Sequence, residues 1–271
     1  GAALSSHKGI NQITFTGSVQ TGISVMQSAA ANIVPVTLEL GGKSPNIVFQ
    51  DADLDRAIPA IVNSITQNAG QTCSAGSRLL VQDTIADELL EQLVVRFGEL
   101  SIGPASINAD VGPIINQKQH ERILDILSEA SKQGNVLVGG KGVEVRDYEN
   151  GYYISPTIIE ATSHEESYVQ EEIFGPVLSV VRFHSVEEAI ELANETEYGL
   201  VAGVWSKDID VAHYVAARIE AGQVFINTYG AAGGVQMPFG GYKKSGIGRE
   251  KSHLAVQNYI QIKNLAIQVK I

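Results

Sequence analysis

The chain has 271 residues and a formal net charge of −11; 44% of its residues are hydrophobic and 18% are charged. This composition is ordinary for a soluble α/β protein, and the length suffices for one large domain or two smaller ones. An acidic chain with no Lys/Arg run longer than two argues against a nucleic-acid partner. No apolar run approaches the roughly 18 residues that span a bilayer, and a single cysteine forms no internal disulfide. We therefore expect a cytoplasmic protein that binds neither nucleic acid nor membrane.

Strand and helix patterns alternate from the N-terminus. Residues 12–15 are typical of a strand, the glycine turn 17-GSVQTG-22 follows, and an Ala-rich helix extends to about Asn32. The segment 36-VTLEL-40 is then typical of a buried strand. This order predicts a parallel βαβ unit.

The alternation continues through the middle of the chain. After a strand at 47-IVF-49, Asp53 can cap a helix with apolar residues at i, i+3, i+4 and i+7, and Pro59 predicts a kink in it. Two further strands are expected, at 78–82 and 223–227. Further helices are expected from Thr84, around 123–127, at 185–194 and at 209–221. Gly222 is expected to be the C-cap of the last helix. The pattern predicts an α/β fold with a mostly parallel sheet flanked by helices.

The C-terminal segment 265-LAIQVKI-271 alternates apolar with polar or small residues, which predicts a half-buried strand. Such a strand needs a partner edge. The pattern leaves open whether the same sheet or another subunit supplies that edge.

Two residues stand out as candidates for chemistry. Cys73 is the only cysteine and lies among small and polar residues in 70-GQTCSAGSR-78. It is either a small core residue or a nucleophile whose neighbours supply N–H donors to a thiolate or oxyanion. Glu39 lies on the otherwise apolar strand 36–40, where a carboxylate is costly, so it either pairs with Lys43 or points to solvent, or it has a raised pKa and serves as a general base.

Three further stretches carry little weight alone. The turn 17–22 opens a helix and can bind an anion, although it lacks the Lys-Ser/Thr of a P-loop. The segments 171-EEIFGPV-177 and 238-PFGGYKKSGIGRE-250 are typical of loops. The six histidines show no spacing of metal ligands, so we expect no metal site.

Taken together, these stretches resemble the NAD(P)-dependent aldehyde dehydrogenases. The matching motifs are 15-FTGSVQTG-22, 38-LELGGKSPNIVF-49, 70-GQTCSAGSR-78, 171-EEIFGPV-177 and 238-PFGGYKKSGIGRE-250, in the family's order, with Cys73 34 positions after Glu39. The resemblance implies oxidation of an aldehyde to an acid through a thiohemiacetal and a thioester, with hydride transfer to NAD or NADP.

The resemblance also assigns roles to residues. It implies that Cys73 is the nucleophile and that Glu39 is the base that activates water. Gly17, Ser18 and Gly22 would form the turn near the cofactor pyrophosphate.

Four further residues follow from the same resemblance. Leu40 would contact the nicotinamide amide through its carbonyl, Glu172 would bind the nicotinamide ribose, and Phe174 would pack near the nicotinamide. Phe239 would form a wall of the substrate tunnel.

Family members are longer at the N-terminus, so we expect this chain to represent a C-terminal portion. The expected divisions are a remnant of the dinucleotide-binding domain (1–40), a catalytic domain (41–241), and a return segment with an oligomerisation strand (242–271). The family's oxyanion-hole asparagine and adenosine-ribose residues are not found in this chain. We therefore expect the isolated chain to bind cofactor weakly, and the longer protein to form a homo-dimer or homo-tetramer.

Two alternatives remain at this point: a non-catalytic fragment, and a cysteine esterase that needs no cofactor. The sequence does not identify the aldehyde. Asn68, Ser74 and the run 228-TYGAAGGVQM-237 would shape its tunnel, and the small residues of that run favour a bulky or ring-bearing substrate.

Overall fold

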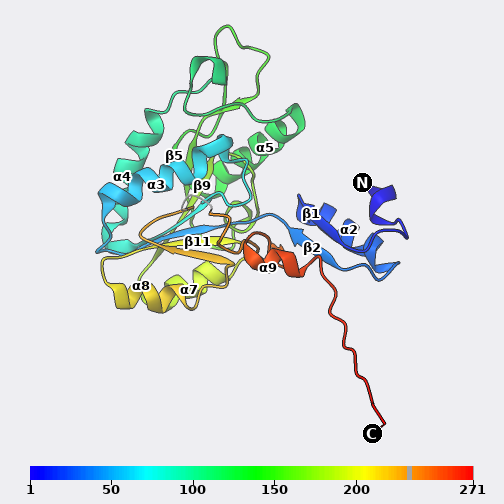
Figure 1. Cartoon of the computed structure of the whole chain (residues 1–271). Coiled ribbons are helices and arrows are strands. Elements are labelled where there is room, and N and C mark those ends of the chain that lie inside the picture. The colour runs from blue at the N-terminus through cyan, green and yellow to red at the C-terminus, as the bar shows by residue number, and fades with distance from the viewer. Residues whose placement is uncertain (231–233, 271) are drawn as a thin grey trace.

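A seven-stranded sheet forms the centre of the computed structural model, which describes residues 1–230 and 234–270 (Figure 1). Neighbouring strands are parallel except at one edge, where β5 is antiparallel to β8. In spatial order the strands are β12 (Gln223–Ile226), β11 (Val201–Trp205), β3 (Pro45–Val48), β4 (Arg78–Gln82), β9 (Val177–Phe183), β8 (Thr157–Glu160) and β5 (Asn135–Val138). The prediction of a mostly parallel sheet is confirmed.

Helices cover both faces of this sheet. They are α3 (Leu54–Thr66), α4 (Asp83–Gly98), α5 (Gln117–Gln133), α7 (Val186–Asn194) and α8 (Ile209–Ala216). Side chains along a strand alternate between faces. On β4, Leu79 and Val81 enter a core shared with α3 and α4, whereas Leu80 enters a second core shared with α5, α7 and α8. The result is a three-layer arrangement with two apolar cores.

A three-stranded sheet carries the N-terminal unit, beside the larger sheet (Figure 1). Strands β1 (Ile13–Thr16) and β2 (Val36–Glu39) are parallel and are joined by α2 (Val19–Ala30), as predicted. From the far end of the chain, β14 (Gly246–Ile247) pairs antiparallel with β2. The last motif of the chain therefore lies against the strand that carries Glu39.

The remaining elements are short. They are α1 (Ala2–Ser5), α6 (Ser167–Gln170), α9 (Ser252–Gln257), β6 (Gly142–Val143), β7 (Tyr153–Ile154), β10 (Tyr198–Gly199), β13 (Tyr242–Lys243) and two 3₁₀ turns, Gln67–Gly70 and Ala105–Ile107. Within the described ranges, no helix is both long and apolar enough to cross a membrane.

The predicted C-cap at Gly222 is wrong. Helix α8 ends at Ala216, six residues earlier, so Gly222 does not terminate it. A Cβ on Gly222 would lie 1.5 Å from the carbonyl oxygen of Gly240. Glycine is therefore required there for close packing of two backbone segments, not for the end of a helix.

The predicted C-terminal strand is also absent from residues 260–270, which have no regular secondary structure. These residues leave the body as an extended tail (Figure 1). The apolar side chains of Leu265, Ile267 and Val269 are 75–78% exposed. A strand is stabilised by the hydrogen bonds of a neighbouring edge, and no described strand pairs with this segment. Residue 271 of this predicted strand, and residues 231–233 of the predicted tunnel stretch 228–237, lie outside the described ranges.

Candidate active site

Glu39 is the last residue of β2, and the neighbouring backbone fixes its position. The N–H of Gly17 donates a hydrogen bond to the carbonyl of Glu39 over 3.1 Å. Ser18 then caps the N-terminus of α2, and its hydroxyl accepts a hydrogen bond from the N–H of Thr21 over 3.3 Å. This connection places the predicted glycine turn directly beside the predicted base.

The carboxylate of Glu39 is buried and unpaired. Its side chain is 4% exposed, and neither carboxylate oxygen has a hydrogen-bond partner among the described residues. Burial raises the pKa of Glu39 to about 7, the negative charge of Glu250 adds to this effect, and Arg249 and Lys251 oppose it. Near neutral pH the group can therefore accept or release a proton.

The alternative in which Glu39 pairs with Lys43 is wrong. The ammonium of Lys43 is buried and donates to the carbonyl of Tyr168 over 2.7 Å.

The loop before Cys73 has an uncommon backbone. Asn68, Ala69 and Gly70 have φ values of 53°, 55° and 71°, in the left-handed region that disfavours side chains with a Cβ. A Cβ on Gly70 would lie 2.1 Å from the carbonyl oxygen of Gly175, so this loop packs closely against the 171–177 motif. Such conformations persist only where surrounding contacts impose them, and they are frequent at functional sites.

Cys73 itself is half-buried. Burial raises the pKa of its thiol, and the negative charges of Glu172 and Glu39 raise it further. The backbone N–H groups of Ser74 and Cys73 lower the pKa, as the sequence led us to expect, but they do not outweigh burial. The thiol is therefore protonated in the resting site, and proton removal has to accompany its use as a nucleophile.

Gly41 and Gly42 allow a third acidic group to approach. The N–H of Gly42 donates to the carboxylate of Glu172 over 3.0 Å. A Cβ on Gly41 would lie 2.3 Å from the other carboxylate oxygen of Glu172, and a Cβ on Gly42 would lie 2.6 Å from the carbonyl oxygen of Cys73. Two glycines in succession thus bring the strand end between Glu172 and the Cys73 loop.

Helix α5 holds the backbone of the 171–177 motif, which the sequence did not reveal. The amide of Gln119 donates to the carbonyls of Ile173 and Phe174 over 2.9 and 3.0 Å. The guanidinium of Arg122 donates to the carbonyls of Ile173 and Glu172 over 2.7 and 2.8 Å. These contacts fix a turn in which Phe174 has a φ of 57°. Polar residues spaced i, i+3 on a surface helix are too common to signal such a role.

A cavity of about 940 Å³ brings most of the predicted residues together. Its lining includes six of them: Gly17, Ser18, Glu39, Cys73, Glu172 and Phe174. The ring of Phe174 is 36% exposed and is available for contact.

The other three predicted residues do not line this cavity. Gly22 packs on Leu40, since a Cβ there would lie 2.6 Å from the Leu40 side chain. Phe239 exchanges two backbone hydrogen bonds with Glu250, over 2.8 and 2.7 Å.

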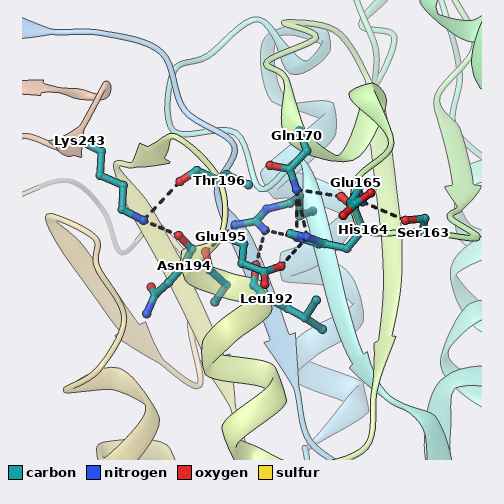
Figure 2. A network of polar contacts seen from close by, with 11 residues as sticks. Ser163, His164, Glu165, Gln170, Leu192, Asn194, Glu195, Thr196 and Lys243 are labelled. Carbon is teal, nitrogen blue, oxygen red and sulfur yellow. Dashed lines mark hydrogen bonds and ion pairs between the residues drawn. The ribbon is translucent and has the colours of Figure 1, made fainter.

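A network of polar contacts surrounds the buried guanidinium of Arg78. The guanidinium of Arg78, at the start of β4, donates to the carbonyls of Lys43, Leu192 and Ala193, each over 2.8 Å. It also contacts His164, whose other ring nitrogen lies 2.8 Å from a carboxylate oxygen of Glu195. Figure 2 shows His164 between Glu195 and Gln170 in this network. These contacts anchor the strand that follows the Cys73 loop.

The chain is similar to known proteins over nearly its whole length. The model of the aldehyde dehydrogenase family matches residues 1–265. Betaine aldehyde dehydrogenase of Bacillus subtilis is 42% identical over 267 residues, covering 98% of this chain and 54% of that protein. Human 4-trimethylaminobutyraldehyde dehydrogenase is 41% identical over 275 residues, covering 99% of this chain and 55% of that protein.

A solved structure shows the same fold. Betaine aldehyde dehydrogenase of Staphylococcus aureus in complex with NAD+ superposes with a TM-score of 0.92 at 39% identity, covering 95% of this chain and 52% of that chain. The present chain thus spans about half the length of these relatives. On the family match and these identities, the chain belongs to the aldehyde dehydrogenase family.

Proposed function

We propose that this chain supplies the nucleophile and the base of an enzyme that oxidises an aldehyde to a carboxylic acid, with NAD or NADP as hydride acceptor. The observation that carries the proposal is the convergence of Cys73, Glu39 and Glu172 on one cavity from three distant parts of the sequence.

Cys73 is the group that attacks. Its sulfur adds to the aldehyde carbon, and the thiol proton ends on the carbonyl oxygen, which gives a thiohemiacetal. The backbone N–H groups of Cys73 and Ser74 lower the pKa of the thiol and would stabilise negative charge that develops on the sulfur. A nicotinamide bound in the cavity would supply the hydride acceptor; loss of the hydride to it and of the hydroxyl proton to water would leave a thioester on Cys73.

Glu39 acts in the release of the acid. In its charged form it takes a proton from water, and the hydroxide attacks the thioester carbon, with Cys73 sulfur as the leaving group. A pKa of about 7 keeps a substantial share of Glu39 charged at neutral pH while leaving it a competent base.

The residues present fit the nicotinamide end of a dinucleotide. Glu172 offers a carboxylate to a ribose diol, Phe174 presents an exposed ring to a planar group, and the N-terminus of α2, beside which Gly17 and Ser18 line the cavity, suits a phosphate. A Cβ on Gly41 would fill the space that the Glu172 carboxylate occupies, which explains the glycine there.

Two further parts of the proposal concern the whole protein. We expect a cytoplasmic homo-dimer or homo-tetramer in which the apolar tail 260–270 pairs with an edge of another subunit. The exposed side chains of Leu265, Ile267 and Val269 support this expectation.

The experiment is a pair of assays on the same preparation. Hydrolysis of p-nitrophenyl acetate reports on Cys73 and Glu39 alone, and aldehyde-dependent NADH or NADPH formation reports on the whole reaction. We expect the first activity from this chain and little of the second, with Cys73→Ala abolishing both. Ester cleavage that persists in Cys73→Ala would refute the assignment of the nucleophile, and no activity of either kind would favour a non-catalytic fragment.

A further inference from the structure

A second cavity, of about 800 Å³, adjoins the Cys73 loop. Thr72 lines both this cavity and the one that holds Glu39 and Glu172, whereas Asn68 and Ser74 line the second cavity only. Thr72 and Ser74, on either side of Cys73, therefore line a second cavity whose lining does not include Cys73, Glu39 or Glu172.

One face of α3 forms the wall of this second cavity. Arg56, Ala60 and Asn63 line it, at the spacing i, i+4 and i+7 that places residues on one side of a helix, and Gln67 lines it directly after the helix ends at Thr66. The opposite side of the same helix is apolar and buried in the core that it shares with α4. This wall therefore presents the carboxamides of Asn63 and Gln67 and the guanidinium of Arg56, which also donates to the carbonyl of Asn227 over 3.4 Å.

Aromatic surface contributes little to this lining. Trp205 belongs to it but is 1% exposed, and its indole N–H donates to the amide oxygen of Asn46 over 2.9 Å. Tyr229 belongs to it as well, and its hydroxyl donates to the carbonyl of Ser74 over 2.9 Å, which holds the loop. Quaternary ammonium groups are typically recognised by open aromatic cages, and these two rings do not form one.

We propose that this cavity receives a polar aldehyde whose chain carries hydrogen-bond-accepting oxygens, either hydroxyls or a carboxylate. The inference rests on the proposed function of Cys73. The amide N–H groups of Asn63 and Gln67 would donate to such oxygens, and beside an alkyl chain they would lose water without gaining a partner, which penalises apolar substrates. Asp55 and Arg56 are both exposed lining residues and add one charge of each sign, so Arg56 distinguishes a carboxylate from a hydroxyl.

The test uses thiohemiacetal formation, which needs no cofactor because the thiol S–H simply adds across the carbonyl. Cys73 is the only cysteine, so one iodoacetamide adduct in the intact mass reports on it alone. Protection of Cys73 from alkylation is measured with glyceraldehyde, succinic semialdehyde, hexanal and betaine aldehyde. Each value is divided by the protection of free N-acetylcysteine, which removes intrinsic differences in aldehyde reactivity.

We expect glyceraldehyde or succinic semialdehyde to protect at concentrations about tenfold lower than hexanal and betaine aldehyde. The double variant Asn63→Leu/Gln67→Leu should remove this preference, and Arg56→Gln should weaken protection by the semialdehyde only. Gln92→Leu is the matched control, because Gln92 is exposed on α4 and lines a different groove.

Two results would overturn the inference. Better protection by hexanal or betaine aldehyde, or an unchanged preference in the folded double variant, would refute the substrate class while leaving Cys73 as a nucleophile. A Cys73 that reacts with iodoacetamide at alkaline pH but is protected by no aldehyde would refute the proposed function, and the inference with it.

Discussion

The buried charged side chains of this region are of two kinds: those whose polar atoms have hydrogen-bond partners, and one, Glu39, whose carboxylate oxygens have none among the described residues. Lys43 and Arg78 are each 1% exposed, and their donors reach backbone carbonyls. Glu39 is 4% exposed, and both of its carboxylate oxygens lack a partner among the described residues.

This difference separates structural charges from functional ones. A buried charge that is fully hydrogen-bonded holds backbone segments together, and its removal leaves buried carbonyls unsatisfied. A buried charge without partners costs stability and is retained where chemistry requires it. We therefore expect substitutions in the first group to affect stability and substitutions in the second to affect rates.

The largest effect is expected for Glu39→Gln. The variant should still show a burst of p-nitrophenol from acylation of Cys73, but thioester hydrolysis should fall by about 10²- to 10⁴-fold, since no base activates the water. In the wild type, hydrolysis should rise with pH through about 7, the pKa of Glu39. Rapid-mixing kinetics across this range separates the two steps.

Glu250→Gln sharpens the same prediction. The charge of Glu250 raises the pKa of Glu39, so the midpoint of hydrolysis should move to lower pH when that charge is removed. A midpoint that stays in place, or a Glu39→Gln variant with an unchanged steady-state rate, would contradict the assignment of Glu39.

Glu39→Gln should not destabilise the fold at neutral or alkaline pH. The pKa of Glu39 is raised from 4.5 to about 7, so the folded state holds the proton more tightly than the unfolded state between these values. The wild type therefore loses stability as the pH rises from about 4.5 to about 7, and the variant escapes this loss. Urea unfolding at both ends of the window measures the difference.

The next largest effect is expected for Arg78→Met. Three carbonyls that accept from Arg78 over 2.8 Å would lose their donors inside the protein. We expect the free energy of unfolding to fall by roughly 3–5 kcal/mol, as measured by urea denaturation. Arg96→Met removes an exposed arginine that contacts Glu99 over 3.7 Å, and it should change stability by less than about 1 kcal/mol. Equal changes in the free energy of unfolding for the two variants would show that the buried hydrogen bonds of Arg78 contribute no more to stability than an exposed ion pair.

The sequence predicted the order of elements and the candidate groups because both depend on local pattern. Alternating strand and helix signals gave the parallel sheet, and an acidic residue on an apolar strand marked Glu39. The motif resemblance joined Glu39 to Cys73, and the structure places both at one cavity. Their chemical roles stay predictions.

What the sequence did not predict depends on contacts between distant segments. The hydrogen bonds of Gln119 and Arg122 to the 172–174 backbone join residues about 50 positions apart. Gly222 was expected to end a helix, since glycine is a common C-cap. Its actual role is a close contact with the backbone of Gly240, which a local sequence pattern does not reveal. The tail at 260–270 has the alternation of a strand, but a strand also requires a partner edge.

Lys43 provides a pH test of the structural group. Burial, with the charge of Arg78, lowers the pKa of Lys43 from 10.5 to about 7. The unfolded state therefore binds more protons between these values, and wild-type stability should rise with pH across that window. Lys43→Met should lack this rise, whereas Lys132→Met, at an exposed position, should keep it. Parallel stability curves for the wild type and Lys43→Met would contradict the lowered pKa.

The smallest effect on the fold, and a selective one on function, is expected for Gly41→Ala. The added Cβ would lie 2.3 Å from a carboxylate oxygen of Glu172, and a flexible side chain can move away without disturbing the backbone. Stability should change by less than about 1 kcal/mol, since Glu172 gains solvent as it moves. In the longer enzyme, KM for the cofactor should rise several-fold, because Glu172 leaves the cavity, while the burst of ester cleavage at Cys73 persists. Gly112→Ala is the control, as its Cβ meets nothing within 4 Å, and an equal rise in KM there would show that the position of Glu172 is not what matters.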